Sequence, residues 1–354
     1  MSKTIKYAVN GALIFGIGNA LLNALKQHQR ISDNPNLEFD WSELFKSAGK
    51  GVLAGSASGA LVGGVMDLQN ASKEPLNTSV ILSTVVANMR LDRNNPTYKK
   101  MSSKADQLIS KIEINFKNQL GGHILRIGST EDNTALSNDF DIDISIPFKP
   151  NSFSSTATMY DELLQFFKNE YNDKDLIKIR EQKKSIGLIF NISGEDYKID
   201  VVPYKLTAGN KNKTAGYLFV NSDSILGNDS YTKTDIPSLK SINLSPVQQK
   251  LLISFKNWKQ KYSVPISSHL LRLLILDAYD YNSGKIPRDF TKKILMVAQH
   301  ISDNIMDRRI VSIENTNNVL TDMNESKKIK IKKACENVIK DYTYHPNTIL
   351  DYFE

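Results

Sequence analysis

Hydrophobic and polar positions alternate without interruption over residues 140–146, which read Phe-Asp-Ile-Asp-Ile-Ser-Ile. A period of two is typical of a half-buried β-strand, because successive side chains point to opposite faces of a sheet. Asp141 and Asp143 are therefore expected on one face, with the isoleucines on the other. The apolar run before them predicts a further strand over 123–127, which ends at the turn Gly128-Ser129.

Two more β-rich runs, residues 185–192 and 198–204, are separated by the polar turn 193–196. This pattern predicts a β-hairpin within a region of strands that begins near residue 176. Its second strand carries Asp200 between two apolar residues. A third carboxylate is thus expected on a strand that neighbours the first two.

Helical signals fill most of the remaining chain. Helices are predicted over residues 78–90, 100–120 and 158–171. From Ser245-Pro246, which is typical of a helix N-cap followed by proline at the first helical position, apolar residues recur every three or four positions to the end of the chain. We therefore expect a sheet flanked by helices and followed by a helical domain.

The first 75 residues differ in composition, with two apolar stretches separated by a polar linker. In the second stretch Gly51, Gly55, Gly59 and Gly63 recur every four residues, which places them along one helical stripe. Each glycine costs a helix about 1 kcal/mol relative to alanine, so close packing against another helix is needed to offset the stripe. Residues 1–75 are therefore predicted to form a helical hairpin with a glycine zipper.

Three interpretations of this hairpin remain open. It is a soluble hairpin packed on itself or on the rest of the chain, an element that joins copies into a homo-oligomer, or a hairpin that inserts into a membrane. A spanning helix needs about 20 apolar residues, and both apolar stretches are shorter or interrupted by polar residues. Membrane contact is the least favoured interpretation, and no convincing cleavage site follows the first stretch, so export is not expected.

The acidic side chains of the strand over 140–146 indicate a candidate metal site. Two carboxylates on one face of a strand repel each other unless a cation lies between them. Hard oxygen ligands at that separation suit Mg2+ or Mn2+. An isolated Asp-x-Asp is more often part of a solvated sheet face, but here Gly128-Ser129 and Asp200 accompany it.

Together these features form a known pattern: Gly128-Ser129, Thr134 five residues after the serine, Asp141-x-Asp143, and a later lone Asp200 in an apolar strand. The pattern resembles the polymerase-β nucleotidyltransferase superfamily, specifically its branch of oligoadenylate synthases and bacterial cGAS/DncV-like nucleotidyltransferases (CD-NTases). The resemblance continues at residues 247–259 and 265–274 and more weakly at 315–319, and it covers roughly residues 97–354.

The resemblance implies an α+β fold with a polymerase-β-type mixed sheet. We expect three domains, namely the helical hairpin of 1–75, a nucleotidyltransferase catalytic domain over 76–240 and a helical nucleotide-binding domain over 241–354. It also implies an enzyme that uses two Mg2+ or Mn2+ ions to join nucleoside triphosphates and release pyrophosphate. The product would be a cyclic or short linear oligonucleotide signal, which in bacterial relatives commonly serves anti-phage defence.

The roles of individual residues follow from the same resemblance. Asp141 and Asp143 are expected to bind both metal ions, and Asp200 to complete the site of the ion that activates the attacking hydroxyl. Gly128, Ser129 and Thr134 would form and support the loop that binds the β- and γ-phosphates. Three residues of the helical half are also expected at the nucleotide, with Lys256 and Ser268 at its phosphates and His269 stacked on a base.

One departure from the pattern concerns Glu131 and Asp132, which lie in the loop just after Gly128-Ser129. Negative charge beside a triphosphate is unfavourable unless these side chains turn away or join the metal shell.

Composition adds little to this picture. The net charge of +7 and the isoelectric point near 9.1 suit a polyanionic substrate, but much of the excess lies in the lysine-rich run 327–333, which is equally consistent with a solvated helix face. A nucleic-acid primer or activator is therefore one candidate partner. The single cysteine, Cys335, excludes an intrachain disulfide and favours a cytoplasmic location, with membrane association through 1–75 as the alternative.

Two alternatives to signal synthesis remain open. The first is template-independent extension of a nucleic-acid end, including DNA. The second belongs to another class, in which the nucleotidyltransferase domain senses nucleotide and residues 1–75 act at a membrane or in oligomerisation. Transfer of AMP onto a tRNA or protein is less favoured, because the enzymes that do so are usually much shorter and lack the helical half.

Overall fold

A computed structural model describes residue 30 and residues 76–208, 214–221, 230–239 and 242–354. Apart from Arg30, the glycine-zipper hairpin expected over residues 1–75 lies outside the described residues. Within the described ranges, no helix is both long enough and apolar enough to cross a membrane.

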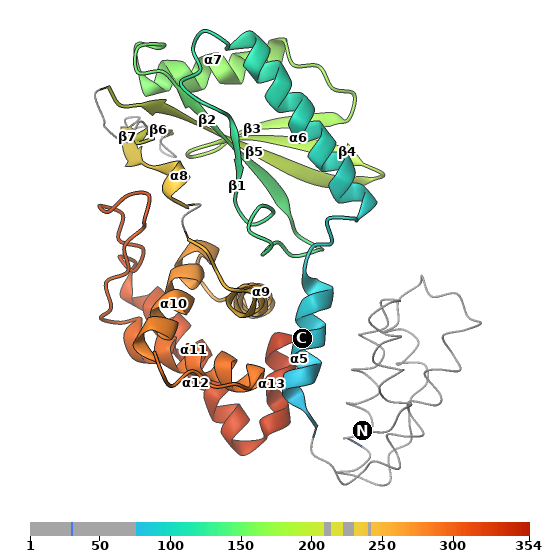
Figure 1. Cartoon of the computed structure of the whole chain (residues 1–354), viewed down its shortest axis with the longest axis vertical. Helices are drawn as coiled ribbons and strands as arrows, with labels where there is room; N and C mark the ends of the chain where they lie inside the picture. The colour runs from blue at the N-terminus through green and yellow to red at the C-terminus, as the bar shows by residue number, and fades with distance from the viewer. Residues whose placement is uncertain (1–29, 31–75, 209–213, 222–229, 240–241) are drawn as a thin grey trace, which may run out of the picture.

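The upper half of the molecule in Figure 1 is built on a seven-stranded mixed sheet among the described residues. Its strands run in the order β1-β2-β5-β4-β3, and β6 pairs with β5 and β7. Only β2 and β5 pair in parallel within this set. The strands are β1 (Leu125–Ile127), β2 (Asp141–Phe148), β3 (Leu176–Glu181), β4 (Ile186–Ile192), β5 (Glu195–Leu206), β6 (Gly216–Val220) and β7 (Ser230–Thr234).

One face of the sheet is covered by α6 (Pro96–Asn115) and α7 (Thr156–Asn169), which bury a common apolar core against it (Figure 1). Ile142 and Ile144 of β2 and Ile199 of β5 belong to this core and are at most 1% exposed. Because side chains alternate along a strand, the acids between these residues lie on the opposite face. The predicted α+β fold, a mixed sheet with flanking helices, is confirmed.

The hairpin between β4 and β5 is tighter than predicted. Its turn consists of Ser193 and Gly194 alone, both with positive φ (57° and 91°), and Ile192 pairs with Glu195. A two-residue turn of this kind matches the twist of the flanking strands. The expected turn over 193–196 was therefore too long, because Glu195 and Asp196 already belong to β5.

The boundaries of two other elements also differ from the prediction. Helix α6 begins at Pro96, capped by the side chain of Asn95, and ends at Asn115, five residues before the predicted end at 120. Strand β1 begins at Leu125 instead of 123. Helix and strand ends depend on local capping and pairing, which the period of the apolar residues does not encode.

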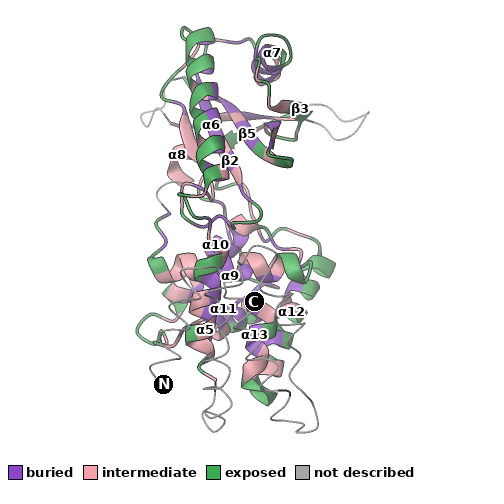
Figure 2. Cartoon of the chain, turned by 90° about the vertical axis from the view of Figure 1, so that its right-hand side faces the viewer, coloured by how far each residue is buried: buried purple, intermediate pink, exposed green. Residues whose placement is uncertain are grey.

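The lower half of the molecule is helical and has its own apolar core, visible as buried residues between the helices in Figure 2. Trp258 belongs to this core, 1% exposed and stacked on Phe353 near the chain end. The predicted N-cap Ser245 is confirmed, and it forms a capping box with Gln248. The helices are α9 (Pro246–Lys261), α10 (Ser268–Tyr281), α11 (Phe290–Asn304), α12 (Glu325–Tyr344) and α13 (Ile349–Phe353), with the short η1 (Pro346–Thr348) before α13 and α8 (Ile236–Leu239) leading in from the sheet.

Helix α5 (Thr78–Met89) precedes the sheet in sequence but packs with these helices. Its Leu82 and Val86 are fully buried in the helical core, and it contacts α9, α11 and α13. The chain therefore passes from the helical half to the sheet and back, so the two halves are joined by two separate connections.

Candidate active site

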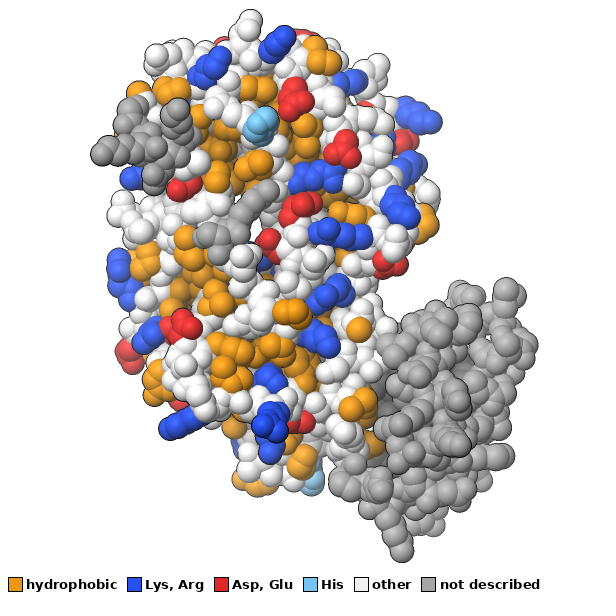
Figure 3. Space-filling model, viewed as in Figure 1, with side chains coloured by type: hydrophobic (Ala, Val, Ile, Leu, Met, Phe, Trp, Pro, Cys, Tyr) orange, Lys and Arg blue, Asp and Glu red, His pale blue; other side chains and the backbone are white. Residues whose placement is uncertain are grey.

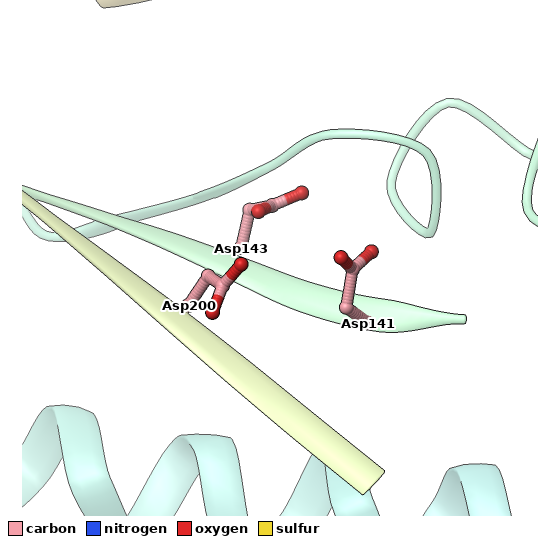
Figure 4. Close-up of side chains that lie close together, drawn as sticks. All are labelled: Asp141, Asp143 and Asp200. Carbon is pink, nitrogen blue, oxygen red and sulfur yellow. The ribbon is translucent and has the colours of Figure 1, made fainter. Parts of the chain in front are cut away.

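The three predicted metal ligands lie together on the open face of the sheet (Figure 4). Asp143 of β2 is directly opposite Asp200 of β5 in the parallel pairing, and Asp141 lies one position further along the same face. One carboxylate oxygen from each residue lies within 4.8 Å of the others, so this group could hold metal ions. Parallel pairing of two strands thus assembles three acids that come from two distant parts of the sequence.

Burial and mutual repulsion disfavour the ionised forms of Asp143 and Asp200, so the pKa of each carboxyl is raised. Burial, followed by the charges of Asp141 and Asp200, raises the pKa of Asp143 to about 8, although Lys256 acts in the opposite direction. Burial and Asp141 also raise the pKa of Asp200, against the effects of a hydrogen bond from Gln182 and the charges of Lys198 and Arg180. A divalent cation would relieve this repulsion, so oxygen ligands of this kind fit Mg2+ or Mn2+.

Asp200 is oriented by residues that the sequence analysis did not identify. Gln182 donates from Nε2 to Asp200 Oδ1 at 3.1 Å, and the Ser185 hydroxyl donates to Gln182 Oε1 at 2.5 Å. Gly187 of β4 lies opposite Asp200, and a Cβ there would meet Gln182 Nε2 at 2.6 Å. A glycine inside an otherwise apolar strand was the one available signal, since it often marks such a close approach.

Gly128 is required at its position for two independent reasons. Its φ is +82°, a conformation that residues with a Cβ adopt at a cost. A Cβ at this position would also lie 2.0 Å from Asp143 Oδ2. The loop that follows folds back on itself, with Thr134 N donating to Ser129 O at 2.9 Å and Asp132 N donating to Gly128 O at 3.2 Å. The Gly128-Ser129 turn is therefore packed directly against the carboxylate group.

Side chains from outside the sheet fix this loop. Lys256 of α9 donates from Nζ to Thr134 O at 2.9 Å, and Arg93, between α5 and α6, donates to Thr130 O at 2.7 Å and Glu131 O at 3.0 Å. Basic and acidic side chains accordingly lie side by side between the sheet and the helices in Figure 3. The loop is therefore fixed by Lys256 of the helical half as well as by β1, the strand that precedes it.

Asp132, which departs from the expected pattern, forms an ion pair with Arg272 of α10. Its charge is thus compensated within the protein, and the unfavourable effect expected on a triphosphate is reduced. Arg272 is 9% exposed and is also the strongest charge acting on Lys256. Burial first, and then Arg272, lower the pKa of Lys256 to about 8, while Asp141 and Asp132 raise it.

The remaining predicted residues lie at the edges of this arrangement. Thr134 is fully buried, and its hydroxyl has no hydrogen-bond partner among the described residues. Ser268 is the first residue of α10, and His269 follows it. His269 Nε2 lies 2.8 Å from the Ser312 hydroxyl and 3.5 Å from a Glu314 carboxylate oxygen, so the ring is already engaged by the loop before α12. Its role in base stacking stays a prediction.

Comparison with solved structures identifies the same fold in bacterial proteins. CdnC of E. coli MS115-1, solved with ATP, matches with a TM-score of 0.59 and 17% identity over 76% of this chain and 92% of its own. The CD-NTase CdnG of Bradyrhizobium diazoefficiens, solved with GTP, matches with a TM-score of 0.59 and 13% identity over 79% of this chain and 96% of its own. CdnC in complex with HORMA-deltaN gives a TM-score of 0.57 at 16% identity over 76% of this chain and 91% of its own.

No family model and no curated protein matches the sequence. At identities of 13% to 17%, the structural likeness establishes a shared fold. The chain therefore has the fold of the CD-NTases, as its motifs predicted.

Replacing Gly128 with alanine should disrupt the carboxylate group, because the new Cβ would overlap the Asp143 carboxylate. Gly194→Ala is the matched control, since Gly194 also has a positive φ (91°) but a Cβ added there would meet no atom within 4 Å. Both variants should lose about 1 kcal/mol of stability from the backbone conformation. Only Gly128→Ala should lose the increase in Tm that Mg2+ gives the wild-type protein, as measured by thermal unfolding. Equal Mg2+ responses in the two variants would contradict this geometry.

Asp143→Asn should stabilise the protein in the absence of metal. Folding raises the pKa of Asp143 to about 8, from about 4 in an unfolded chain. A carboxyl shifted in this direction stabilises the fold below its unfolded pKa, and that contribution is lost as pH rises through the folded pKa. The asparagine has no such loss, so the Tm difference in favour of the variant should grow between about pH 4 and pH 8.

Thermal unfolding in EDTA across this pH range measures the difference, on a scale of roughly 2–4 °C for each kcal/mol. Added Mg2+ should then raise the Tm of the wild-type protein and leave that of Asp143→Asn nearly unchanged. A variant no more stable than wild type at any pH would show that burial of the Asp143 carboxylate beside the other two acids does not destabilise the metal-free fold.

Proposed function

We propose that this protein is a metal-dependent nucleotidyltransferase that joins nucleoside triphosphates and releases pyrophosphate. The observation that carries the proposal is the placement of Asp141, Asp143 and Asp200 on one sheet face, in contact with a glycine turn that opens a loop held by cationic side chains. Acids grouped in this way beside such a turn suit phosphoryl transfer better than a structural role.

Each part of the site has a proposed task. Asp141 and Asp143 hold two Mg2+ or Mn2+ ions, and Asp200, oriented by Gln182, completes the site nearer the attacking hydroxyl and helps to remove its proton. When bound, the ions lower the pKa of the attacking hydroxyl and neutralise charge on the phosphates. The turn Gly128-Ser129 binds the β- and γ-phosphates through its backbone N–H groups and the serine hydroxyl.

The helical half completes the phosphate site. Lys256 already touches the loop through Thr134 O, and its charge acts on Asp143. Burial lowers the pKa of Lys256, and a bound triphosphate would restore the charged ammonium. Ser268 at the start of α10 adds a hydroxyl, and the helix N-terminus there favours negative charge.

For the product, we propose a cyclic or short linear oligonucleotide that acts as a signal, with anti-phage defence as its biological role. The support is the common fold with the CD-NTase structures that contain ATP or GTP. Cytoplasmic location belongs to the same proposal. Elongation of a nucleic-acid end remains the second candidate, because basic residues follow the acids along the same sheet face.

The direct test is incubation with each labelled NTP and dNTP in the presence of Mg2+ or Mn2+, with pyrophosphate release as the first readout. We expect release by the wild-type protein. In Asp141→Ala the rate of release should fall by at least about a hundredfold, because the metal ions at the reacting phosphates lose a carboxylate ligand. Mass spectrometry and nuclease digestion then distinguish cyclic from linear products and 2′ from 3′ linkages.

The outcome also separates the classes of function. The assay is repeated with added extract from infected and from uninfected cells. If the protein then releases no pyrophosphate with any nucleotide and either metal, the result would count against an enzyme. A cellular effect that survives Asp141→Ala but not deletion of residues 1–75 would favour the nucleotide-sensing alternative.

A further inference from the structure

The sheet face that carries the three acids continues beyond them onto β4 and β3. The strand pairing places four residues in one row across the sheet: Asp143 on β2, Asp200 on β5, Gly187 on β4 and Arg180 on β3. Residues paired in this way point to the same face of a sheet. Arg180 therefore stands on the same face as the carboxylate group, in the same row.

The adjacent row adds two lysines to this face. Asp141 pairs with Lys198, Lys198 with Ile189, and Ile189 with Lys178. Three cations, Lys178, Arg180 and Lys198, thus follow the acids on the open face, and we refer to them as the basic face. All three are exposed.

Ion pairs with the described residues do not neutralise the basic face. In the part of the chain that the structure describes, none of its three side chains forms a salt bridge or donates a hydrogen bond. Apart from the three site acids, two other acids near it are engaged elsewhere. Glu181, on the other face of β3, binds Lys168 of α7 at 2.9 Å. Asp196, on the same face at the hairpin end, accepts from Asn191 at 2.8 Å.

The basic face also lies on the correct side of the acids for an acceptor. The Gly128 turn follows β1, which flanks β2 on the side away from β5, and Lys256 binds the same loop. When a donor triphosphate is held on that loop, its α-phosphate is transferred and its pyrophosphate departs toward the β1 side. In phosphoryl transfer the attacking and leaving oxygens are roughly in line, so the attacking hydroxyl approaches from the opposite side. That side is β5, β4 and β3.

We propose that Lys178, Arg180 and Lys198 bind the phosphates of the acceptor, and that this acceptor is a single-stranded nucleotide chain lying across β5, β4 and β3 with its terminal hydroxyl at Asp200. The proposal rests on the proposed function, because the acceptor is the substrate whose hydroxyl attacks the donor triphosphate. Arg180 is two strands from Asp200, about 10 Å, which a short nucleotide chain spans. A protein or bare nucleoside acceptor would have no phosphates for these cations.

The test compares two charge-matched double variants, Arg180→Gln/Lys198→Gln on the basic face and Lys285→Gln/Arg288→Gln at exposed positions just before α11. Binding of fluorescein-labelled single-stranded RNA and DNA oligonucleotides is measured by anisotropy over a range of salt concentrations. The basic-face variant should bind on the order of tenfold more weakly, and its slope of log K against log salt should fall by roughly 1.4, for two lost phosphate contacts. The variant before α11 should bind as wild type does.

Three further measurements make the result specific. The Mg2+-induced rise in Tm should be unchanged in the basic-face variant, which shows that the carboxylate group is intact. Arg180→Lys/Lys198→Arg should restore oligonucleotide binding, because it keeps both charges. In steady-state assays the KM for an oligonucleotide acceptor should rise while the KM for the donor NTP stays constant.

Equal oligonucleotide binding by the two double variants would overturn the proposal, and so would a loss confined to donor NTP binding. Binding does not depend on turnover. If the wild-type protein releases no pyrophosphate from any NTP, the proposed function fails, while the anisotropy measurements still decide whether the basic face binds a nucleotide chain.

Discussion

Repulsion among three carboxylates on adjacent parallel strands is the constraint around which this structure is organised. The pairing of β2 with β5 places Asp143 opposite Asp200, and burial of the group raises the pKa of Asp143 to about 8. The neighbouring chain accommodates this arrangement at specific points: Gly128 leaves space for the Asp143 carboxylate, and Gln182 donates to that of Asp200. Acids held together against their own repulsion are typical of groups whose proper partner is a cation.

The same group couples the two halves of the molecule. The loop after Gly128 belongs to the sheet, but Lys256 and Arg272 of the helical half bind its Thr134 carbonyl and its Asp132 carboxylate. A change in the angle between the halves would therefore move the loop relative to Asp143. Anchoring from both sides gives the Gly128-Ser129 turn, which we propose binds phosphate, a defined position without a ligand, and this lowers the entropic cost of binding one.

The sequence predicted those parts of the site that depend on periodicity. Alternation placed Asp141 and Asp143 on one face, and the next apolar strand supplied Asp200, so the fold class and the carboxylate group followed from local patterns. Gln182 and Arg272 could not be found in this way, because their partners lie at 18 and 140 residues' separation. Nor did local pattern show that α5 packs into the helical core, since its burial depends on helices from the far end of the chain.

Charge is distributed around the three acids in an order that matches the proposed chemistry. Acids occupy the centre, Lys256 and Arg272 bind the loop that follows β1, and the basic face lies on β5 and β3. A reaction between a triphosphate and a phosphorylated chain needs anion binding at both ends and cations held at the point of transfer. A site for a neutral acceptor would need the first set of cations alone. The second set therefore argues that the substrate on that side is also an anion.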